Sequence, residues 1–219
     1  MAASRDKHLN YLDMHSSTDR GAGDLLSKPG PIILASQSPR RRQLLEWAEV
    51  PFRIVVKETD ESYPAGLPMQ EIAMHIARNK GLAVQNEHHF TQPVLSADTI
   101  VVLDEKVIGK PKDREDAIAT LAALSGRKHY VVTGVVILHQ GRELAFADTT
   151  EVEFHPLSQE QIAFYIDKYK PYDKAGAYAI QEWIGVTGIK SVSGDFYNVM
   201  GLPVSRVVQA LARITATDL

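Results

Sequence analysis

Residues 32–45 constrain the fold of this chain more than any other stretch. The apolar run Ile32–Ala35 predicts a short buried strand, and a serine-containing turn then leads into a helix. Ser38 is a good N-cap, because its hydroxyl can accept a hydrogen bond from an unpaired amide of the first helical turn. Pro39 suits the first helical position, where its missing N–H and fixed φ are tolerated. Apolar residues continue at helical spacing through Leu45, so we expect a strand–turn–helix unit.

Three consecutive arginines, Arg40, Arg41 and Arg42, occupy the first turn of that predicted helix. A helix N-terminus carries partial positive charge, so each arginine there is unfavourable by about 0.3–1 kcal/mol. An anion bound at this end would explain them, because free amides, the helix dipole and guanidinium groups all bind phosphate. The alternative is that the arginines point into solvent and only improve solubility. The sequence favours the first interpretation, a phosphate site.

The composition limits the functions open to the chain. Its 219 residues suffice for one large domain or two small lobes with an ample core. A net charge of −3 argues against a general nucleic-acid binder, so the arginines form a local basic site. The absence of cysteine excludes a thiol nucleophile and a disulfide, and is compatible with a reducing, cytoplasmic compartment. The longest apolar run, around Val131–Leu138, is too short to span a membrane.

Residues 1–29 differ in composition from the rest of the chain. They are polar and lack the apolar segment of a secretory signal. Aspartates in this stretch also argue against a transit peptide, since such peptides are poor in acidic residues. We therefore expect a flexible extension over 1–29 and a single folded domain over 30–219.

Strands and helices alternate along the remaining sequence. Expected strands lie at 52–56, 94–108 (a hairpin), 130–138 and 144–154. Expected helices lie at 69–85, 113–124, 158–169 and from Pro203 onward. Capping boxes mark two helix starts, Asp113 with Asp116 and Ser158 with Gln161. The glycine-rich segment 173–201 predicts mostly loops and short strands. This order is typical of an α/β protein with a mixed sheet and flanking helices.

Asp98 is a lone carboxylate at the start of an apolar strand. Strand ends are favoured ligand sites in α/β sheets, and a carboxylate there could hold a divalent ion, orient a water or accept its proton. The alternative is that Asp98 only caps a turn. Lys110 follows between a glycine and a proline, which favours an extended backbone open to a ligand, although a single exposed lysine is weak evidence.

A second carboxylate is available in an acidic loop, at Asp60 or Glu61. Mg²⁺ binds through one or two carboxylates plus waters and substrate phosphates, so Asp98 with Glu61 would suffice. The alternative is a solvated loop, and Lys80 on the polar side of its predicted helix is most simply a surface residue. The eight histidines show no HxxxH or HExxH spacing, so a histidine metal site is not expected.

The segment Tyr172–Gln181 places small residues between aromatic ones. This leaves its backbone accessible, and the Gln181 amide offers a paired donor and acceptor suited to a nucleobase edge. Packing of the tyrosines in the core is the alternative.

Together these motifs resemble the Maf family of nucleoside triphosphate pyrophosphatases, once named for septum formation. The resemblance runs in order from about residue 31 to the end of the chain. It rests on seven motifs: Ala35–Arg41, the Glu61 loop, Ala77–Lys80, Ala97–Thr99, Gly109–Pro111, Asp173–Gln181 and Gly201–Pro203. One such motif is weak evidence, whereas seven in sequence order are specific. The extension over 1–29 departs from typical bacterial members, and Arg42 is not diagnostic.

The resemblance implies an elongated, two-lobed α/β fold with a central cleft, related to inosine-triphosphate pyrophosphatases. It implies hydrolysis of a nucleoside triphosphate to monophosphate and pyrophosphate with Mg²⁺ or Mn²⁺, and it suggests a homodimer. Asp98 would be the general base and, with Glu61, a metal ligand. Arg41, Lys80 and Lys110 would be catalytic residues together with Asp98, placed around the metal and phosphates. Substrate-binding residues would include Ser36, Ser38 and Lys174. The set Arg40, Thr99 and Gln181 matches positions that separate family branches and resembles the branch hydrolysing dTTP and UTP, rather than 7-methyl-GTP.

Two other classes of function compete with hydrolysis. A nucleotide-binding regulator of cell division would need no turnover, yet simple phosphate binding does not require both Asp98 and Glu61. A single-strand nucleic-acid binder is disfavoured by the net charge and by the scarcity of aromatic residues on basic stretches. Release of pyrophosphate from dTTP with Mg²⁺ would separate the enzyme from the regulator.

Overall fold

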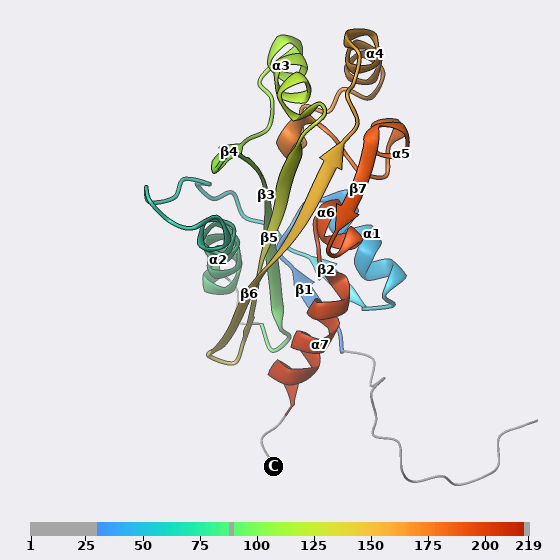
Figure 1. The fold of residues 1–219 in the computed structure, drawn as a ribbon. Coiled ribbons are helices and arrows are strands. Elements are labelled where there is room, and N and C mark those ends of the chain that lie inside the picture. The colour runs from blue at the N-terminus through green and yellow to red at the C-terminus, as the bar shows by residue number, and fades with distance from the viewer. Residues whose placement is uncertain (1–29, 88–89, 217–219) are drawn as a thin grey trace, which may run out of the picture.

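One mixed sheet forms the centre of the molecule (Figure 1). The computed structural model describes residues 30–87 and 90–216. The strands run in the order β2-β1-β3-β5-β6-β7, and β4 pairs with part of β3. Their bounds are β1 (Ile32–Leu34), β2 (Phe52–Ile54), β3 (Val94–Leu103), β4 (Lys106–Ile108), β5 (Lys128–His139), β6 (Arg142–Phe154) and β7 (Ile189–Ser193). β1 is parallel to both of its neighbours and the other pairs are antiparallel, which confirms the predicted mixed sheet.

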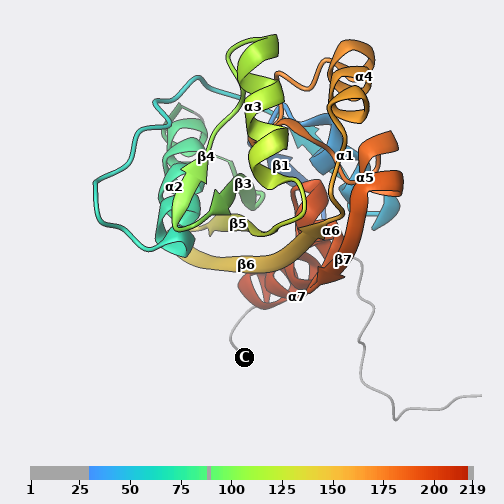
Figure 2. The same ribbon diagram turned by 45° about the horizontal axis from the view of Figure 1, so that its top comes forward.

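Helices cover both faces of this sheet and one end of it (Figure 2). They are α1 (Pro39–Trp47), α2 (Met69–Glu87), α3 (Arg114–Leu124), α4 (Gln159–Tyr169), the 3₁₀ turn η1 (Ala175–Ala177), α5 (Trp183–Gly188), α6 (Phe196–Met200) and α7 (Val204–Thr215). α2 lies on one face of β3 and β5, whereas α1, α6 and α7 lie on the other (Figure 1). Within the described residues, no helix is long and apolar enough to cross a membrane.

The side chains of β3 alternate between these two faces, as the period of a strand requires. Ile100 and Val102 pack beneath α2. Leu95 and Ala97 pack in the cluster that α1 and α7 help to form. Asp98 therefore faces α2, and the residue after it faces α1.

The apolar core on the α1 side of the sheet is divided in two. One cluster packs α1 and α7 against the sheet, with Leu45 and Leu211 at its centre. A second cluster packs α3 and α4 together, with Leu121 and Ile166 fully buried. Both clusters pack against the same face of the sheet, and the two lobes that the family resemblance implies stay a prediction.

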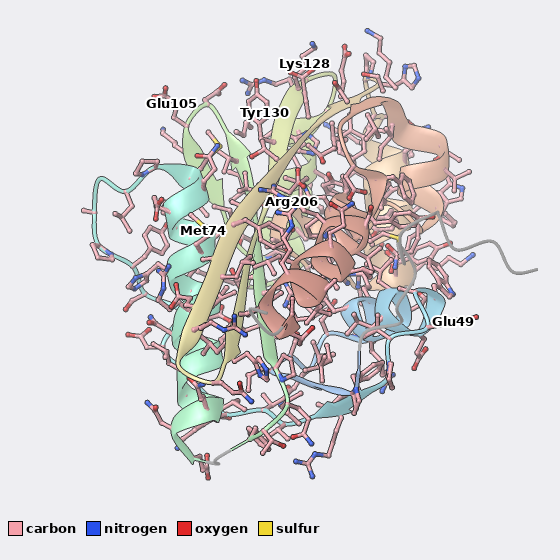
Figure 3. All side chains as sticks on the ribbon, turned by 90° about the horizontal axis from the view of Figure 1, so that it is seen from below. Glu49, Met74, Glu105, Lys128, Tyr130 and Arg206 are labelled. Atoms are coloured by element: carbon pink, nitrogen blue, oxygen red, sulfur yellow. The ribbon has the colours of Figure 1, made fainter. Side chains whose placement is uncertain are left out.

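One helix packs on each face of the long strands β5 and β6, α2 on one and α7 on the other. A Cβ added at Gly134 of β5 would lie 2.2 Å from the backbone carbonyl carbon of Ala73, so α2 can approach this closely only because the residue is glycine. On the opposite face, Arg206 of α7 lies over the ring of Phe146 and donates to the carbonyl of Ala147 at 2.9 Å (Figure 3). This close packing also fixes the position of Lys80, which α2 carries.

Local capping signals locate several helix ends correctly. Ser38 accepts a hydrogen bond from the backbone N–H of Arg41, and the Ser158–Gln161 capping box is complete. Asp113 also caps α3. The predicted box with Asp116 is wrong, however, because the Asp116 carboxylate accepts from the N–H of residue 112 instead of the cap residue.

The segment 173–201 contains more regular structure than we expect from its sequence. It holds the helices α5 and α6 as well as β7, so the prediction of mostly loops and short strands is wrong in part. These helices have only six and five residues, too few for a periodic pattern. Tertiary contacts stabilise α6, because the buried Asn198 amide donates to the Val131 carbonyl and to Thr150 Oγ1, each at 3.0 Å. The expected extension over 1–29 lies outside the described residues, as does the end of the predicted domain at 217–219.

Candidate active site

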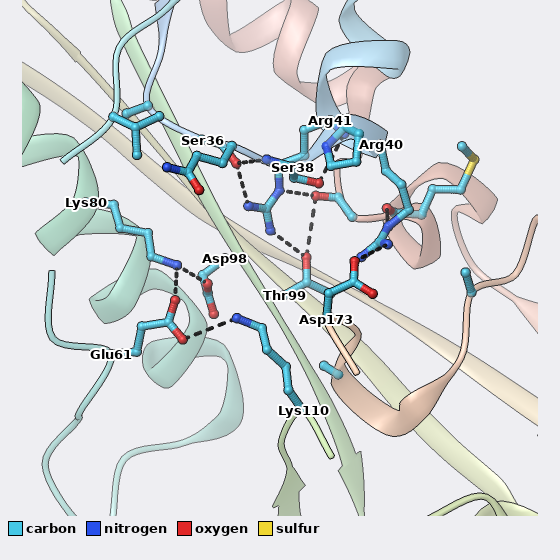
Figure 4. A pocket seen from close by; sticks show the side chains of 18 of the residues that line it. Ser36, Ser38, Arg40, Arg41, Glu61, Lys80, Asp98, Thr99, Lys110 and Asp173 are labelled. Atoms are coloured by element: carbon cyan, nitrogen blue, oxygen red, sulfur yellow. Dashed lines mark hydrogen bonds and ion pairs between the residues drawn. The ribbon is translucent and has the colours of Figure 1, made fainter. Parts of the chain in front are cut away.

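A cavity of about 560 Å³ opens at the edge of the sheet beside β3 (Figure 4). β1 pairs with β3 at Val94–Leu95, and β4 pairs with it at Val101–Leu103. Between these contacts, Ser96–Ile100 has no strand on this edge in the described part of the chain. Both faces of β3 therefore border the same space, which is why the neighbours Asp98 and Thr99 both line the cavity.

Most of the predicted site residues meet in this cavity. They come from the turn before α1, the first turn of α1, the loop after β2, α2, β3 and the segment after β4. The predicted residues that line it are Ser36, Ser38, Arg40, Arg41, Glu61, Lys80, Asp98, Thr99 and Lys110. Segments far apart in the sequence thus converge on a single site.

Arg41 is the most buried cation of the site, with 8% of its surface exposed. Its guanidinium donates to the Gly201 carbonyl at 2.8 Å, Ser36 Oγ at 3.1 Å and Thr99 Oγ1 at 3.0 Å. Burial lowers the pKa of Arg41 from its ordinary value, and the negative charge of Asp98 opposes the shift. Arginine stays protonated in proteins, so a fixed positive charge stands at the N-terminus of α1.

The three arginines have different surroundings. Arg42 is exposed, as the solvent interpretation predicts. Arg40 donates through Nε to the Met200 carbonyl at 3.2 Å, and its Nη1 lies 3.9 Å from Asp173 Oδ2. The carbonyls at the C-terminus of α6 thus accept from both Arg40 and Arg41. These two hydrogen bonds partly offset the unfavourable free energy of placing two cations at a helix N-terminus. The phosphate interpretation alone does not include this compensation.

Lys80 joins two carboxylates across the cavity. Its Nζ lies 2.7 Å from Glu61 Oε1 and 2.7 Å from Asp98 Oδ1. Lys110 Nζ lies 3.7 Å from the other oxygen of Glu61. The hydrogen bond from Lys80 lowers the pKa of Glu61, against the opposing effect of partial burial. Lys80 is therefore a residue of the cavity, not the simple surface residue that its helix position suggests.

The donor set around Lys80 fits a magnesium-type ion that also binds a substrate. Within the described residues, no group of three or more histidine, cysteine or acidic side chains could hold a metal by itself. Glu61 and Asp98 nevertheless lie close together, because both accept a hydrogen bond from the Lys80 ammonium group. Two carboxylates are what Mg²⁺ needs when waters and phosphates complete its shell.

Two predicted substrate-binding residues do not line the cavity. Lys174 is buried behind its wall, where Nζ lies 2.7 Å from Asp173 Oδ1 and 3.6 Å from Glu182 Oε1. Gln181 is exposed at the end of the Tyr172–Gln181 segment and is not among the lining residues. Its role toward a base stays a prediction.

Sequence analysis missed Thr133 as a residue of the site region. Its buried Oγ1 lies 2.9 Å from Thr99 Oγ1 and donates to the Asn198 carbonyl at 3.2 Å. It thereby connects α6 to the hydroxyl that contacts Arg41. A signal was present, because Thr133 is the polar residue within the apolar run of β5.

Fold and cavity together define a class of protein. It is a mixed α/β protein whose open sheet edge holds cations beside two carboxylates. A family model described as "Maf-like protein" matches residues 31–214. The chain belongs to this family.

Several relatives resemble the chain over most of its length. A dTTP/UTP pyrophosphatase of Cytophaga hutchinsonii is 48% identical over 188 residues, covering 86% of each chain. A dTTP/UTP pyrophosphatase of Bacteroides thetaiotaomicron is 46% identical and covers 84% of this chain and 95% of its own. Among solved structures, the Staphylococcus aureus Ham1 protein aligns with a TM-score of 0.39 and 13% identity, over 57% of this chain and 71% of its own.

Proposed function

We propose that this protein hydrolyses nucleoside triphosphates, with dTTP and UTP as favoured substrates, to nucleoside monophosphate and pyrophosphate. The observation that carries the proposal is the contact of Lys80 with both Glu61 and Asp98, in a cavity that also contains the buried Arg41. The curated relatives, named dTTP/UTP pyrophosphatases, support the choice of substrates. A cytoplasmic location and a homodimer are part of the same proposal.

The phosphates would bind at the N-terminus of α1. Arg41 supplies positive charge there, and Ser36 and Ser38 supply hydroxyls near the first turn of the helix. Lys110 adds a second cation to the cavity beside Glu61. A helix N-terminus favours anions, and guanidinium groups bind phosphate oxygens strongly. Arg40 would add a further donor at the rim.

Glu61 and Asp98 would hold the divalent ion, Mg²⁺ or Mn²⁺. When bound, this ion would neutralise charge on the phosphate oxygens. Lys80 keeps the two carboxylates close together, because one ammonium group contacts both at 2.7 Å.

Asp98 would orient the attacking water and take its proton. The water oxygen bonds to the α-phosphorus while the bond from that phosphorus to the bridging oxygen breaks, and pyrophosphate leaves with the electron pair. A positioned general base contributes about 10²–10⁴-fold to a rate. Positioning and fixed charges would supply most of the remaining acceleration.

A regulator that binds nucleotide without turnover is not favoured. Phosphate binding alone gives no reason for two carboxylates to lie beside the cations, because they repel the ligand. The relatives named for pyrophosphatase activity also argue for an enzyme.

The direct test is release of pyrophosphate from a panel of triphosphates with Mg²⁺, with Mn²⁺ and with chelator. We expect release from dTTP and UTP above the purine nucleotides, and none with chelator. Tight binding of dTTP without release would contradict the proposal and favour the regulator.

The preference for a pyrimidine nucleobase can be tested separately with the variant Gln181→Glu. The amide of Gln181 would bond the 4-oxo edge of a pyrimidine, and a carboxylate cannot donate to that oxygen. We expect the preference for dTTP and UTP to weaken across the same panel. An unchanged preference would remove Gln181 from this role.

A further inference from the structure

Five polar side chains form a continuous chain from the core to the cavity wall, which we name the relay. Its members are Arg40, Asp173, Lys174, Glu182 and Tyr165. Arg40 Nη1 lies 3.9 Å from one oxygen of Asp173, and Lys174 Nζ lies 2.7 Å from the other. The same Nζ lies 3.6 Å from Glu182 Oε1, and the Tyr165 hydroxyl donates to Glu182 Oε2.

The inner part of the relay is protected from solvent. Tyr165 is fully buried, and the side chains of Lys174 and Glu182 are 10% and 23% exposed. The Tyr165 hydroxyl also accepts from the N–H of Ala179 at 3.2 Å, so both of its hydrogen-bonding roles are filled. Burial raises the pKa of Tyr165, and this hydroxyl therefore remains a donor. Ion pairs in such surroundings are screened less than surface pairs.

The outer part of the relay is open and faces the cavity. The Asp173 side chain is 63% exposed, and both Asp173 and Arg40 line the cavity. At 3.9 Å, Arg40 and Asp173 are too far apart for a hydrogen bond, whereas Lys174 and Asp173 are within one. Lys174 thus holds the carboxylate by a hydrogen bond, Arg40 and Asp173 form only a long ion pair, and Arg40 Nη1 can still donate to a ligand.

We propose that Tyr165, Glu182 and Lys174 are positioning residues that keep Arg40 available at the cavity wall. Tyr165 fixes Glu182, Glu182 fixes Lys174, and Lys174 restrains Asp173. Without this restraint, the Asp173 carboxylate would move the short remaining distance, turn its long ion pair with Arg40 into a hydrogen-bonded one and compete with the nucleotide. The inference deepens the proposed function and rests on it only in taking the ligand to be a nucleotide.

The test begins with Tyr165→Phe, which removes one hydroxyl and keeps the ring in the core. The matched control is Tyr169→Phe, because the Tyr169 ring stacks on that of Tyr165 but lies outside the relay. A single hydrogen bond of this kind corresponds to about a two- to tenfold effect, so we expect KM for dTTP to rise by that factor with kcat unchanged. The control should leave both constants unchanged. An unchanged KM in Tyr165→Phe would overturn the relay.

A double-mutant cycle shows whether the effect passes through Arg40. In an Arg40→Gln background, Tyr165→Phe should raise KM no further, because the group that the relay positions is gone. Two independent, multiplying effects would mean that Tyr165 acts only on the fold and would overturn the proposal. If Tyr165→Phe does not fold, Glu182→Gln gives the same cycle, since it keeps the shape of the side chain and removes its charge.

The same cycle is also measured by calorimetric binding of dTTP, which needs no turnover. Binding by the wild type without hydrolysis would overturn the proposed function and leave the relay measurable. Hydrolysis with independent effects in the cycle would overturn the relay alone. A wild type that neither binds nor hydrolyses dTTP would overturn both.

Discussion

Arg41 combines burial, charge and hydrogen bonding at a single position. Its fork of donors reaches the Gly201 carbonyl and the hydroxyls of Ser36 and Thr99. A lysine has one ammonium group on a flexible stem and cannot reproduce this planar arrangement. The geometry of Arg41, more than its charge alone, is therefore what the site uses.

We expect Arg41→Lys to be harmful even though it keeps the charge. Partners left unsatisfied in a buried site cost about 1–3 kcal/mol, so both the free energy of unfolding and kcat/KM should fall. Urea unfolding and initial rates with dTTP measure the two effects. Arg42→Lys is the control, because Arg42 lies exposed in the same helical turn. Equal behaviour of the two variants would contradict the role of Arg41.

His129 predicts a pH dependence of stability. It is fully buried, stacks on Phe154 and contacts the Tyr178 hydroxyl through Nε2 at 2.7 Å. Burial lowers the pKa of His129 to about 4, whereas a histidine in an unfolded chain has a pKa of about 6.5. The folded state thus disfavours protonation. Above pH 6.5 His129 is neutral in both states, and its full contribution to the free energy of unfolding is present. As the pH falls from 6.5 toward 4, the unfolded chain is protonated first, and this contribution decreases by at most about 1.4 kcal/mol per pH unit.

The comparison that isolates this effect is wild type against His129→Gln. We expect the wild type to lose free energy of unfolding more steeply than the variant between about pH 6.5 and pH 4. Urea unfolding across that window measures both slopes. Parallel slopes would show that His129 does not contribute the dependence.

At the scale of elements, α2 links the core to the site. It lies directly on Gly134 of β5, and it presents Lys80 to Asp98 on the adjacent strand. The same packing that buries the apolar face of the helix therefore fixes the distance between an ammonium group and two carboxylates.

Gly134→Ala should disturb stability and activity together. The new methyl group would meet backbone atoms of Ala73, which cannot move aside as a side chain can, so we expect a loss of about 3 kcal/mol. Lys80 would shift with the helix and kcat/KM would fall. Gly30→Ala is the control, because a Cβ there meets nothing within 4 Å. Retention of wild-type stability by Gly134→Ala would show that α2 does not need this close approach.

Elements with a local signal could be predicted from the sequence. The N-caps Ser38 and Ser158 each form a hydrogen bond with the residue three positions later, so the sequence alone locates the starts of α1 and α4. α5 and α6 could not be predicted, since six and five residues carry too little periodicity and α6 is stabilised by bonds from Asn198 to distant strands.

At the scale of the whole molecule, the site lies where two packed regions of the core meet. Val101 and Tyr178 belong to the cluster with α3 and α4, Met200 belongs to the cluster with α1 and α7, and all three line the cavity. The free edge of β3 between them gives access from both faces of the sheet. This topology allows Arg40 and Arg41 from the α1 face and Lys80 and Asp98 from the α2 face to share one space.

The candidate site was predictable in its residue types but not in its contacts. Asp98 and the arginines stand out as charges beside apolar runs. Lys80 pairs with Glu61, 19 residues away in the sequence, and with Asp98, 18 residues away. No short sequence motif predicts contacts at such separations. The family resemblance alone indicated Lys80, while the burial of Lys174 away from the cavity follows from packing that no short motif encodes.

The most direct test is the turnover of dTTP by Asp98→Asn with Mg²⁺. We predict that kcat falls by about 10²–10⁴-fold while the variant still binds dTTP, because the amide cannot accept the proton of the attacking water. Asp104→Asn is the control, since Asp104 follows the same strand and its side chain is 65% exposed. Full activity in Asp98→Asn would contradict the account.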